Sequence, residues 1–160
     1  FCINLLKSIK FKVTFTIIGP IEDDAYWNIC KNKIQDLNKN INVIYLGFKT
    51  KDEIFKRMKK SHCLLHPSKF ESFGHVIYES LMNALPVITS DKTPWRKLNN
   101  QKGSKVIYTA KLNRIDEFKR NINFIKGCKL NTYKTLRKNA FKYSINYYKK
   151  FNLIKSFLND

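Results

Sequence analysis

The sequence has few acidic residues and no long apolar run. Twelve Asp and Glu stand against 31 Lys and Arg among 160 residues, a formal net charge of +19. No apolar stretch approaches the roughly 20 residues that a membrane-spanning helix needs. The opening stretch FCINLLKSIKFK carries lysines between its apolar residues. It also lacks the small residues that mark the cleavage site of a signal peptide. We therefore expect neither a spanning segment nor a signal peptide in these residues.

Clustered metal ligands are also missing. The four cysteines form no CxxC pair and have no histidine cluster beside them: Cys2, Cys30, Cys63 and Cys128. Metal sites need ligands at close spacing, and small disulfide scaffolds are shorter and denser in cysteine. We expect reduced thiols in a cytoplasmic protein, with no metal site and no cofactor.

Several motifs that define enzyme classes are absent. There is no GxxxxGK[ST] or GxGxxG, so P-loop and dinucleotide sites lack support, and no GxSxG elbow of a hydrolase. No linker rich in Pro, Gly or Ser divides the chain and no internal repeat occurs. With 43% hydrophobic residues the chain can build a core, and its length favours a single domain over residues 1–160.

The apolar residues alternate between two periodicities. Short β-branched or apolar runs that end in glycine, proline or serine alternate with segments of helical spacing. Strands are expected at 12–18, 42–47, 62–67, 86–90 and 105–108, and helices at 21–40, 50–61 and 74–83, with a short helix from Trp95 and two helices at the end. Short connections of this kind imply βαβ crossovers. The fold class is therefore α/β: a Rossmann-like parallel sheet with helices on both faces and extra C-terminal helices.

In such sheets, ligands bind outside the carboxyl ends of the strands. Four turns fall at those ends: Gly19-Pro20, residues 47–49, residues 66–68 and residues 89–91. The stretch FESFGHVIYESL, residues 70–81, follows the third of these turns. We expect it to lie at the ligand-binding edge.

Within this stretch, SFGH at 72–75 lies where a loop becomes a helix. The first N–H groups of a helix have no intrahelical partner and favour an anion, and Gly74 would let a ligand approach the backbone. Glu79 lies in the helix among apolar neighbours, and an ionised carboxylate can accept two hydrogen bonds from a ribose diol. The alternatives are an ordinary loop-to-helix turn and a glutamate on an exposed helix flank. Glu71 would lie nearer the end of the ligand beyond the phosphates.

Other candidate residues have simpler explanations. The acidic run Glu22-Asp23-Asp24 could bind a metal, but it occupies the expected first turn of a helix, where acids stabilise the N-terminus. His62 and His66 flank a strand, which predicts a core or edge position for each. His75 follows Gly74 at the helix start, close to any bound sugar or phosphate.

Two glutamates separated by seven residues, with FG between them and a Pro-Val strand after them, resemble the signature of retaining glycosyltransferases of family 4. The stretches GPIEDDAYWNIC, HPSKFESFGHVIYESL and PVITSDKTPWRKL resemble bacterial polysaccharide and O-antigen members, and the likeness covers about residues 1–110. The resemblance implies a GT-B fold, two Rossmann-like domains around a cleft. This chain is similar to the C-terminal domain, which binds a nucleotide-sugar donor such as a UDP- or GDP-sugar.

The resemblance implies a role for each residue of the stretch and its surroundings. Glu71 is the expected catalytic residue, beside the hydroxyls of the donor sugar, and Glu79 is expected to bind the ribose. The backbone would meet the sugar and diphosphate at Ser72, Phe73, Gly74 and His75, and Gly19 would lie close to the phosphates. The nucleobase would pack near Gly47, Phe48, Pro67 and Ser68. The family transfers sugars with retention and needs no metal.

The sequence also departs from the family. Ala84 stands before Leu85-Pro86 where glycine is common, and GSKV at 103–106 replaces a glycine-tryptophan pair. The Arg and Lys that bind phosphate, and the N-terminal domain that holds the glycan or lipid-linked acceptor, would precede Phe1. We therefore expect a fragment, in preference to a split or degenerate enzyme, that alone binds donor weakly and catalyses little.

Positive charge is densest toward the C-terminus, where residues 111–160 hold 13 basic and 3 acidic residues. Three explanations remain open: a solvated basic face, a surface for an anionic membrane, and a non-catalytic module that binds nucleic acid. Four aromatic residues recur at core-like helical spacing, which argues against a stacking platform for nucleic acid: Tyr143, Tyr147, Tyr148 and Phe151. A membrane surface would place the protein peripherally on the inner face of the plasma membrane.

Overall fold

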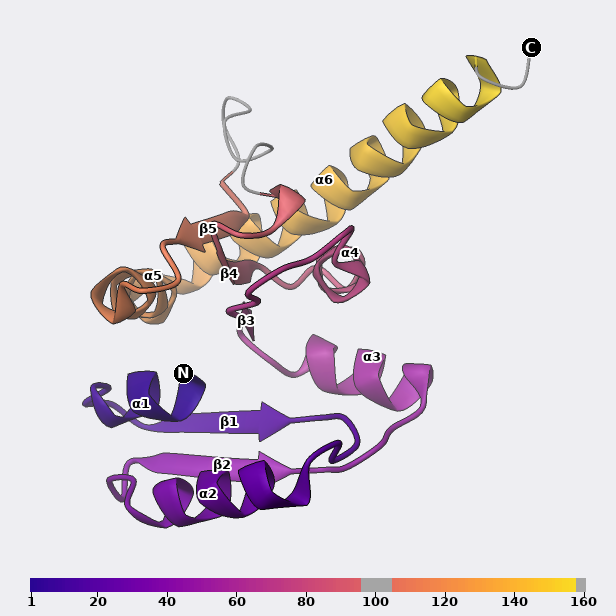
Figure 1. The fold of residues 1–160 in the computed structure, drawn as a ribbon. Coiled ribbons are helices and arrows are strands. Elements are labelled where there is room, and N and C mark those ends of the chain that lie inside the picture. The colour runs from indigo at the N-terminus through magenta and orange to yellow at the C-terminus, as the bar shows by residue number, and fades with distance from the viewer. Residues whose placement is uncertain (96–104, 158–160) are drawn as a thin grey trace. The chain divides into compact units, whose positions relative to one another are not determined.

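The computed structural model describes residues 1–95 and 105–157 (Figure 1). The chain divides into two compact units, residues 1–56 and residues 57–160, and each is described by itself. The single domain expected over residues 1–160 stays a prediction. The α/β class with parallel strands is confirmed in both units.

The first unit is a parallel strand pair with its helices. It contains α1 (Cys2–Lys7), β1 (Val13–Ile17), α2 (Asp24–Gln35), β2 (Ile41–Tyr45) and most of α3 (Lys51–Lys59). β1 pairs with β2 from Val13↔Ile41 to Ile17↔Tyr45, so both strands end at the same edge. The buried side chains are Leu5, Leu6, Ile9 and Ile41.

Side-chain hydrogen bonds cap both helix starts in this unit. α2 begins at Asp24 and ends at Gln35, so it is shorter than the helix expected over residues 21–40. Asp23 caps α2, its carboxylate accepting a hydrogen bond from Tyr26 N at 2.8 Å. Thr50 and Glu53 form a reciprocal box before α3: Glu53 Oε2 accepts from Thr50 N at 2.9 Å, and Glu53 N donates to Thr50 Oγ1 at 3.4 Å. The acidic run is thus a helix start. Within the described residues, no group of three His, Cys, Asp or Glu could hold a metal ion.

The second unit is a three-stranded parallel sheet with helices around it. It contains β3 (Leu64–His66), α4 (His75–Met82), β4 (Val87–Ser90), β5 (Ile107–Ala110), α5 (Ile115–Gly127) and α6 (Leu130–Phe157), with strand order β3-β4-β5. Every residue of the central strand β4 is buried, which accounts for its apolar Val87-Ile88. The core around it includes Ile77, Leu81, Trp95, Val106, Ile107 and Phe118.

Two expectations about the strands differ from the structure. The strand expected at 105–108 runs from Ile107 to Ala110, because it pairs in register with β4 up to Ser90 and Asp91 N then donates to Ala110 O at 2.8 Å. We expected one sheet, but the described strands form two parallel sheets. β1 pairs with β2 in one, and β3, β4 and β5 pair in the other. The short helix expected after Trp95 lies outside the described residues.

The last helix, α6, is long and basic as expected. It passes α4, where Tyr147 of α6 and Tyr78 of α4 have ring centroids 6.0 Å apart, and its final turns extend beyond α4 (Figure 1). Across the part of the chain that the structure describes, no helix combines the length and apolarity needed to cross a bilayer.

Candidate functional site

The carboxyl edge of the second sheet is held by two hydroxyl side chains of β4. Thr89, the register partner of His66, donates from Oγ1 to the His66 carbonyl at 2.8 Å. Ser90 Oγ donates in the same way to the Ser68 carbonyl. These bonds fasten the end of β3 and the start of the following loop to the buried central strand. The loop that carries Glu71 therefore begins from a fixed point.

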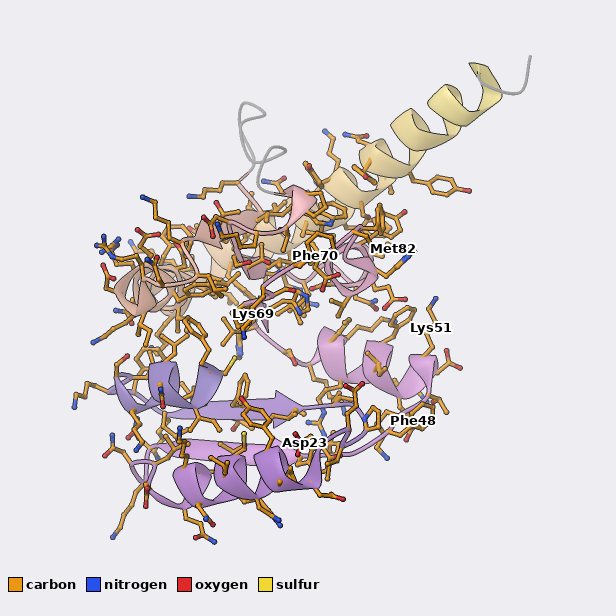
Figure 2. The ribbon with its side chains drawn as sticks, in the orientation of Figure 1. Asp23, Phe48, Lys51, Lys69, Phe70 and Met82 are labelled. Carbon is orange, nitrogen blue, oxygen red and sulfur yellow. The ribbon has the colours of Figure 1, made fainter. Side chains whose placement is uncertain are left out.

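The loop then folds on itself through Ser68. The Ser68 hydroxyl donates to the Phe70 carbonyl at 2.7 Å and accepts from Phe70 N at 3.3 Å. Pro67 and Ser68 are half-buried, whereas the Phe70 side chain, labelled in Figure 2, is 78% exposed. The Ser68 hydroxyl therefore shapes the loop, and the predicted nucleobase contacts of Pro67 and Ser68 stay predictions.

Glu71 is paired with a histidine at the end of β3. Its Oε1 lies 2.7 Å from Nε2 of His66, and the two side chains are 25% and 27% exposed. The carboxylate is thus held at the sheet edge while remaining within reach of solvent. The sequence placed His66 only at a core or edge position. Glu71 follows His66 by five residues, just after the end of a predicted strand, and this spacing could have indicated that the two side chains meet.

Gly74 begins α4 in a left-handed conformation. It is the N-cap residue, with φ of 78°, and a Cβ built on it would lie 3.3 Å from Nε1 of Trp95 and 3.2 Å from Cδ1 of Ile77. Residues with a side chain rarely adopt this conformation. Glycine is therefore required here by the backbone and by the packing of Trp95 behind it, in addition to any close approach of a ligand.

Trp95 ties this turn to the rest of the unit. Its Nε1 donates to the Phe73 carbonyl, and its side chain is 1% exposed. The Phe73 ring centroid lies 5.7 Å from that of Trp95 and 6.2 Å from that of Tyr147. Burial in this cluster raises the pKa of the nearby Tyr78 phenol. The Phe73 ring is therefore part of an aromatic cluster, whereas Ser72 and His75 on either side are exposed.

The first turn of α4 presents backbone N–H groups. Among the described residues, no side chain caps this helix. His75 is exposed and Glu79 is half-buried, and their four-residue spacing places them on one helix face. An uncapped helix start and a carboxylate one turn further along the same face suit a ligand that carries both an anion and hydroxyl groups.

The carboxyl edge of the first sheet brings Gly19 and Gly47 together. Gly19 N donates to the Gly47 carbonyl at 3.0 Å, and the Tyr45 hydroxyl donates to the Gly19 carbonyl at 2.9 Å. Both glycines have positive φ, 145° and 64°. Phe48 beyond them is 76% exposed (Figure 2). The turn at Gly19, predicted to contact phosphate, and the turn at Gly47-Phe48, predicted to contact the nucleobase, thus share one edge of the first sheet, and their roles stay predictions.

Parallel βα units with glycine-containing turns at the carboxyl edges are the features of a Rossmann-like nucleotide-binding domain. Residues 2–143 match the model of the family described as glycosyl transferases group 1. Because the match covers most of the sequence, the chain belongs to this family, which confirms the resemblance to glycosyltransferases of GT-B fold.

The chain is also similar to individual proteins. Over 92 residues the chain is 32% identical to an uncharacterized 41.2 kDa protein in the cps region of Klebsiella pneumoniae, and the match covers 57% of this chain and 23% of that protein. The fold is similar to that of Anabaena HepE in complex with UDP-glucose, with a TM-score of 0.75, 22% identity, and 89% of this chain and 38% of HepE covered.

A third relative is WaaG, a glycosyltransferase involved in lipopolysaccharide biosynthesis. The TM-score is 0.67 at 14% identity, and the match covers 89% of this chain and 38% of WaaG. The chain therefore spans less than half the length of these relatives.

Proposed function

We propose that this chain is the donor-binding part of a retaining glycosyltransferase that transfers a sugar from a nucleotide-sugar to a polysaccharide or lipid-linked acceptor. The observation that carries the proposal is the segment from Glu71 to Glu79 at the carboxyl edge of a parallel sheet in a member of this family. The acceptor domain would lie in a part of the protein outside these 160 residues.

In this proposal the two glutamates have different tasks. Glu79 accepts two hydrogen bonds from the ribose hydroxyls, and Glu71 accepts from hydroxyls of the transferred sugar. The diphosphate meets the backbone N–H groups from Ser72 to His75, an arrangement supported by the uncapped start of α4. Gly19 approaches the phosphates, and the turns at Gly47-Phe48 and at Pro67-Ser68 contact the nucleobase. No metal is needed, because N–H groups and basic side chains offset the diphosphate charge.

The donor is a UDP- or GDP-sugar, and the complexes of HepE with UDP-glucose and with UDP favour a UDP-sugar. Calorimetric titration with UDP-glucose, UDP-N-acetylglucosamine, GDP-mannose and the free nucleoside diphosphates tests this proposal. We expect at least one sugar nucleotide to bind at millimolar concentration or below. The absence of heat from the whole panel would contradict it. Proton NMR of the product's anomeric centre in the complete protein tests retention.

A second function, peripheral binding to an anionic membrane on the cytoplasmic side, is supported by one face of α6. This face, the basic-apolar face, carries exposed Phe141, Ile145 and Tyr148 and, beside them at helical spacing, the exposed lysines Lys134, Lys138, Lys142 and Lys149. No acidic residue occurs between Leu130 and Phe157. Apolar side chains flanked by lysines are typical of helices that lie in a membrane interface.

The nucleic-acid alternative has less support. Tyr147 packs on Trp95 with ring centroids 4.9 Å apart, and Tyr143 is half-buried, as their core-like spacing predicted. Tyr148 is instead 56% exposed, so the core position expected for it is wrong, and the Phe151 side chain lies outside the described residues. The half-buried rings of Tyr143 and Tyr147 are therefore poorly placed to serve as a stacking platform.

A further inference from the structure

The pair formed by His66 and Glu71 suggests a task for a histidine that the family signature does not include. His66 Nε2 and Glu71 Oε1 are 2.7 Å apart. Each side chain is about three-quarters buried, with 27% and 25% exposed. A neutral imidazole that donates from Nε2 forms a charge-assisted hydrogen bond to a carboxylate, and such bonds are short and strong.

The two partners differ in how firmly the backbone holds them. His66 is the last residue of β3, and its carbonyl accepts from Thr89 Oγ1 at 2.8 Å and from Ser68 N at 2.9 Å. Glu71 lies in the loop between β3 and α4. A glutamate on a loop has many side-chain conformations and loses entropy when it is ordered. A hydrogen bond from a fixed strand end selects one of them before any ligand arrives.

We propose that His66 is a positioning residue that orients the Glu71 carboxylate toward the sugar of the donor. His66 binds Oε1, which directs Oε2 to a hydroxyl group of that sugar. The inference rests on the proposed function, because it takes Glu71 to meet the donor sugar. It adds that discrimination between a sugar nucleotide and the bare nucleoside diphosphate depends on His66.

Two substitutions at one position separate hydrogen bonding from packing. In the complete protein, His66→Leu removes the donor, whereas His66→Gln places an amide N–H near the position of Nε2. We expect His66→Leu to weaken binding of the best sugar nucleotide in the panel above about tenfold, the effect of losing a charge-assisted bond. Binding of the matching nucleoside diphosphate should change less than about twofold, since it lacks the sugar. His66→Gln should recover most of the loss.

His62→Leu is the matched control, because His62 precedes the same strand at its other end and contacts Tyr133 with ring centroids 5.7 Å apart. It should leave both affinities unchanged. A second test combines His66→Leu with Glu71→Ala. If His66 acts only through Glu71, adding His66→Leu to Glu71→Ala should weaken sugar-nucleotide binding no further.

Three results would overturn the inference. In the first, His66→Leu weakens the sugar nucleotide and the nucleoside diphosphate equally, or its effect adds fully to that of Glu71→Ala; His66 is then merely structural. In the second, Glu71→Ala leaves sugar-nucleotide binding unchanged, so Glu71 does not meet the sugar, although the nucleotide site stands. In the third, the wild-type protein binds no sugar nucleotide, and the proposed function fails together with the inference.

Discussion

The indole of Trp95 donates a hydrogen bond to the carbonyl of Phe73, 22 residues earlier in the chain. The same nitrogen lies 3.3 Å from the position that a Cβ on Gly74 would occupy. One buried side chain thus sets both the backbone position of the turn and the identity of the residue that begins α4. The geometry of the candidate phosphate-binding turn depends on this contact.

Removing the Trp95 hydrogen bond should therefore lower stability. Trp95→Phe retains a ring but leaves the Phe73 carbonyl without this donor, which should cost about 1–3 kcal/mol in the free energy of unfolding measured with urea. Trp27→Phe is the control, because among the described residues the Trp27 indole packs on Tyr45, with ring centroids 4.6 Å apart, and donates no hydrogen bond. An equal loss from the two substitutions would show that the bond to Phe73 contributes nothing.

A side chain at Gly74 should be poorly tolerated. Gly74→Ala combines the left-handed φ of 78° with contacts at 3.2 and 3.3 Å, and the backbone conformation alone costs about 1–2 kcal/mol. Gly127→Ala provides the comparison, because a Cβ at that position meets nothing within 4 Å and alanine favours the end of α5. Urea titration should show a loss for the first substitution and no loss for the second. If Gly74→Ala unfolds at the same urea concentration as the wild-type protein, this prediction is wrong.

The thiol of Cys63 should make stability fall at alkaline pH. Burial raises its pKa from about 9 to about 12. The folded state therefore holds this proton more tightly than the unfolded state, and the stabilisation is complete below pH 9 and is lost as the pH rises toward 12. Cys63→Ala should flatten the decline in unfolding free energy between pH 8 and pH 10.5. A decline that is identical in both proteins would assign it to other groups.

The basic-apolar face of α6 should bind anionic vesicles. Each lysine near such a surface contributes about 1 kcal/mol, so replacing Lys138, Lys142 and Lys149 by glutamate should weaken co-sedimentation with phosphatidylserine vesicles by about a hundredfold or more. Changing Lys31, Lys33 and Lys39 of the first unit to glutamate alters net charge equally and should have a smaller effect. Equal losses would indicate attraction by overall charge rather than by this face.

The order of helices and strands was readable from the sequence because each element carries its own periodicity and its own stop signal. Gly19 and Pro67 end strands, and Asp23 and Thr50 begin helices, and all of these signals are local. Contacts between distant segments were not readable. In the sequence His66 resembles a core histidine, because only the folded loop brings Glu71 into contact with it. Similarly, no local pattern in the sequence links Trp95 to Phe73. The start of β5 was misplaced by two residues because pairing with β4, rather than its own composition, sets its limits.

The ribose contact proposed for Glu79 is the central claim, and titration of one variant with two nucleotides tests it most directly. The bidentate charge-assisted contact is worth about 1.5–3 kcal/mol, so Glu79→Ala should weaken UDP or GDP, whichever the protein binds, by tenfold or more. Binding of the matching 2′,3′-dideoxynucleotide should be weak and equal in both proteins. Asp36→Ala is the control, because it removes a carboxylate at the end of α2 that lies away from Gly19, and it should change neither affinity. Undiminished nucleoside diphosphate binding by Glu79→Ala would contradict the assignment.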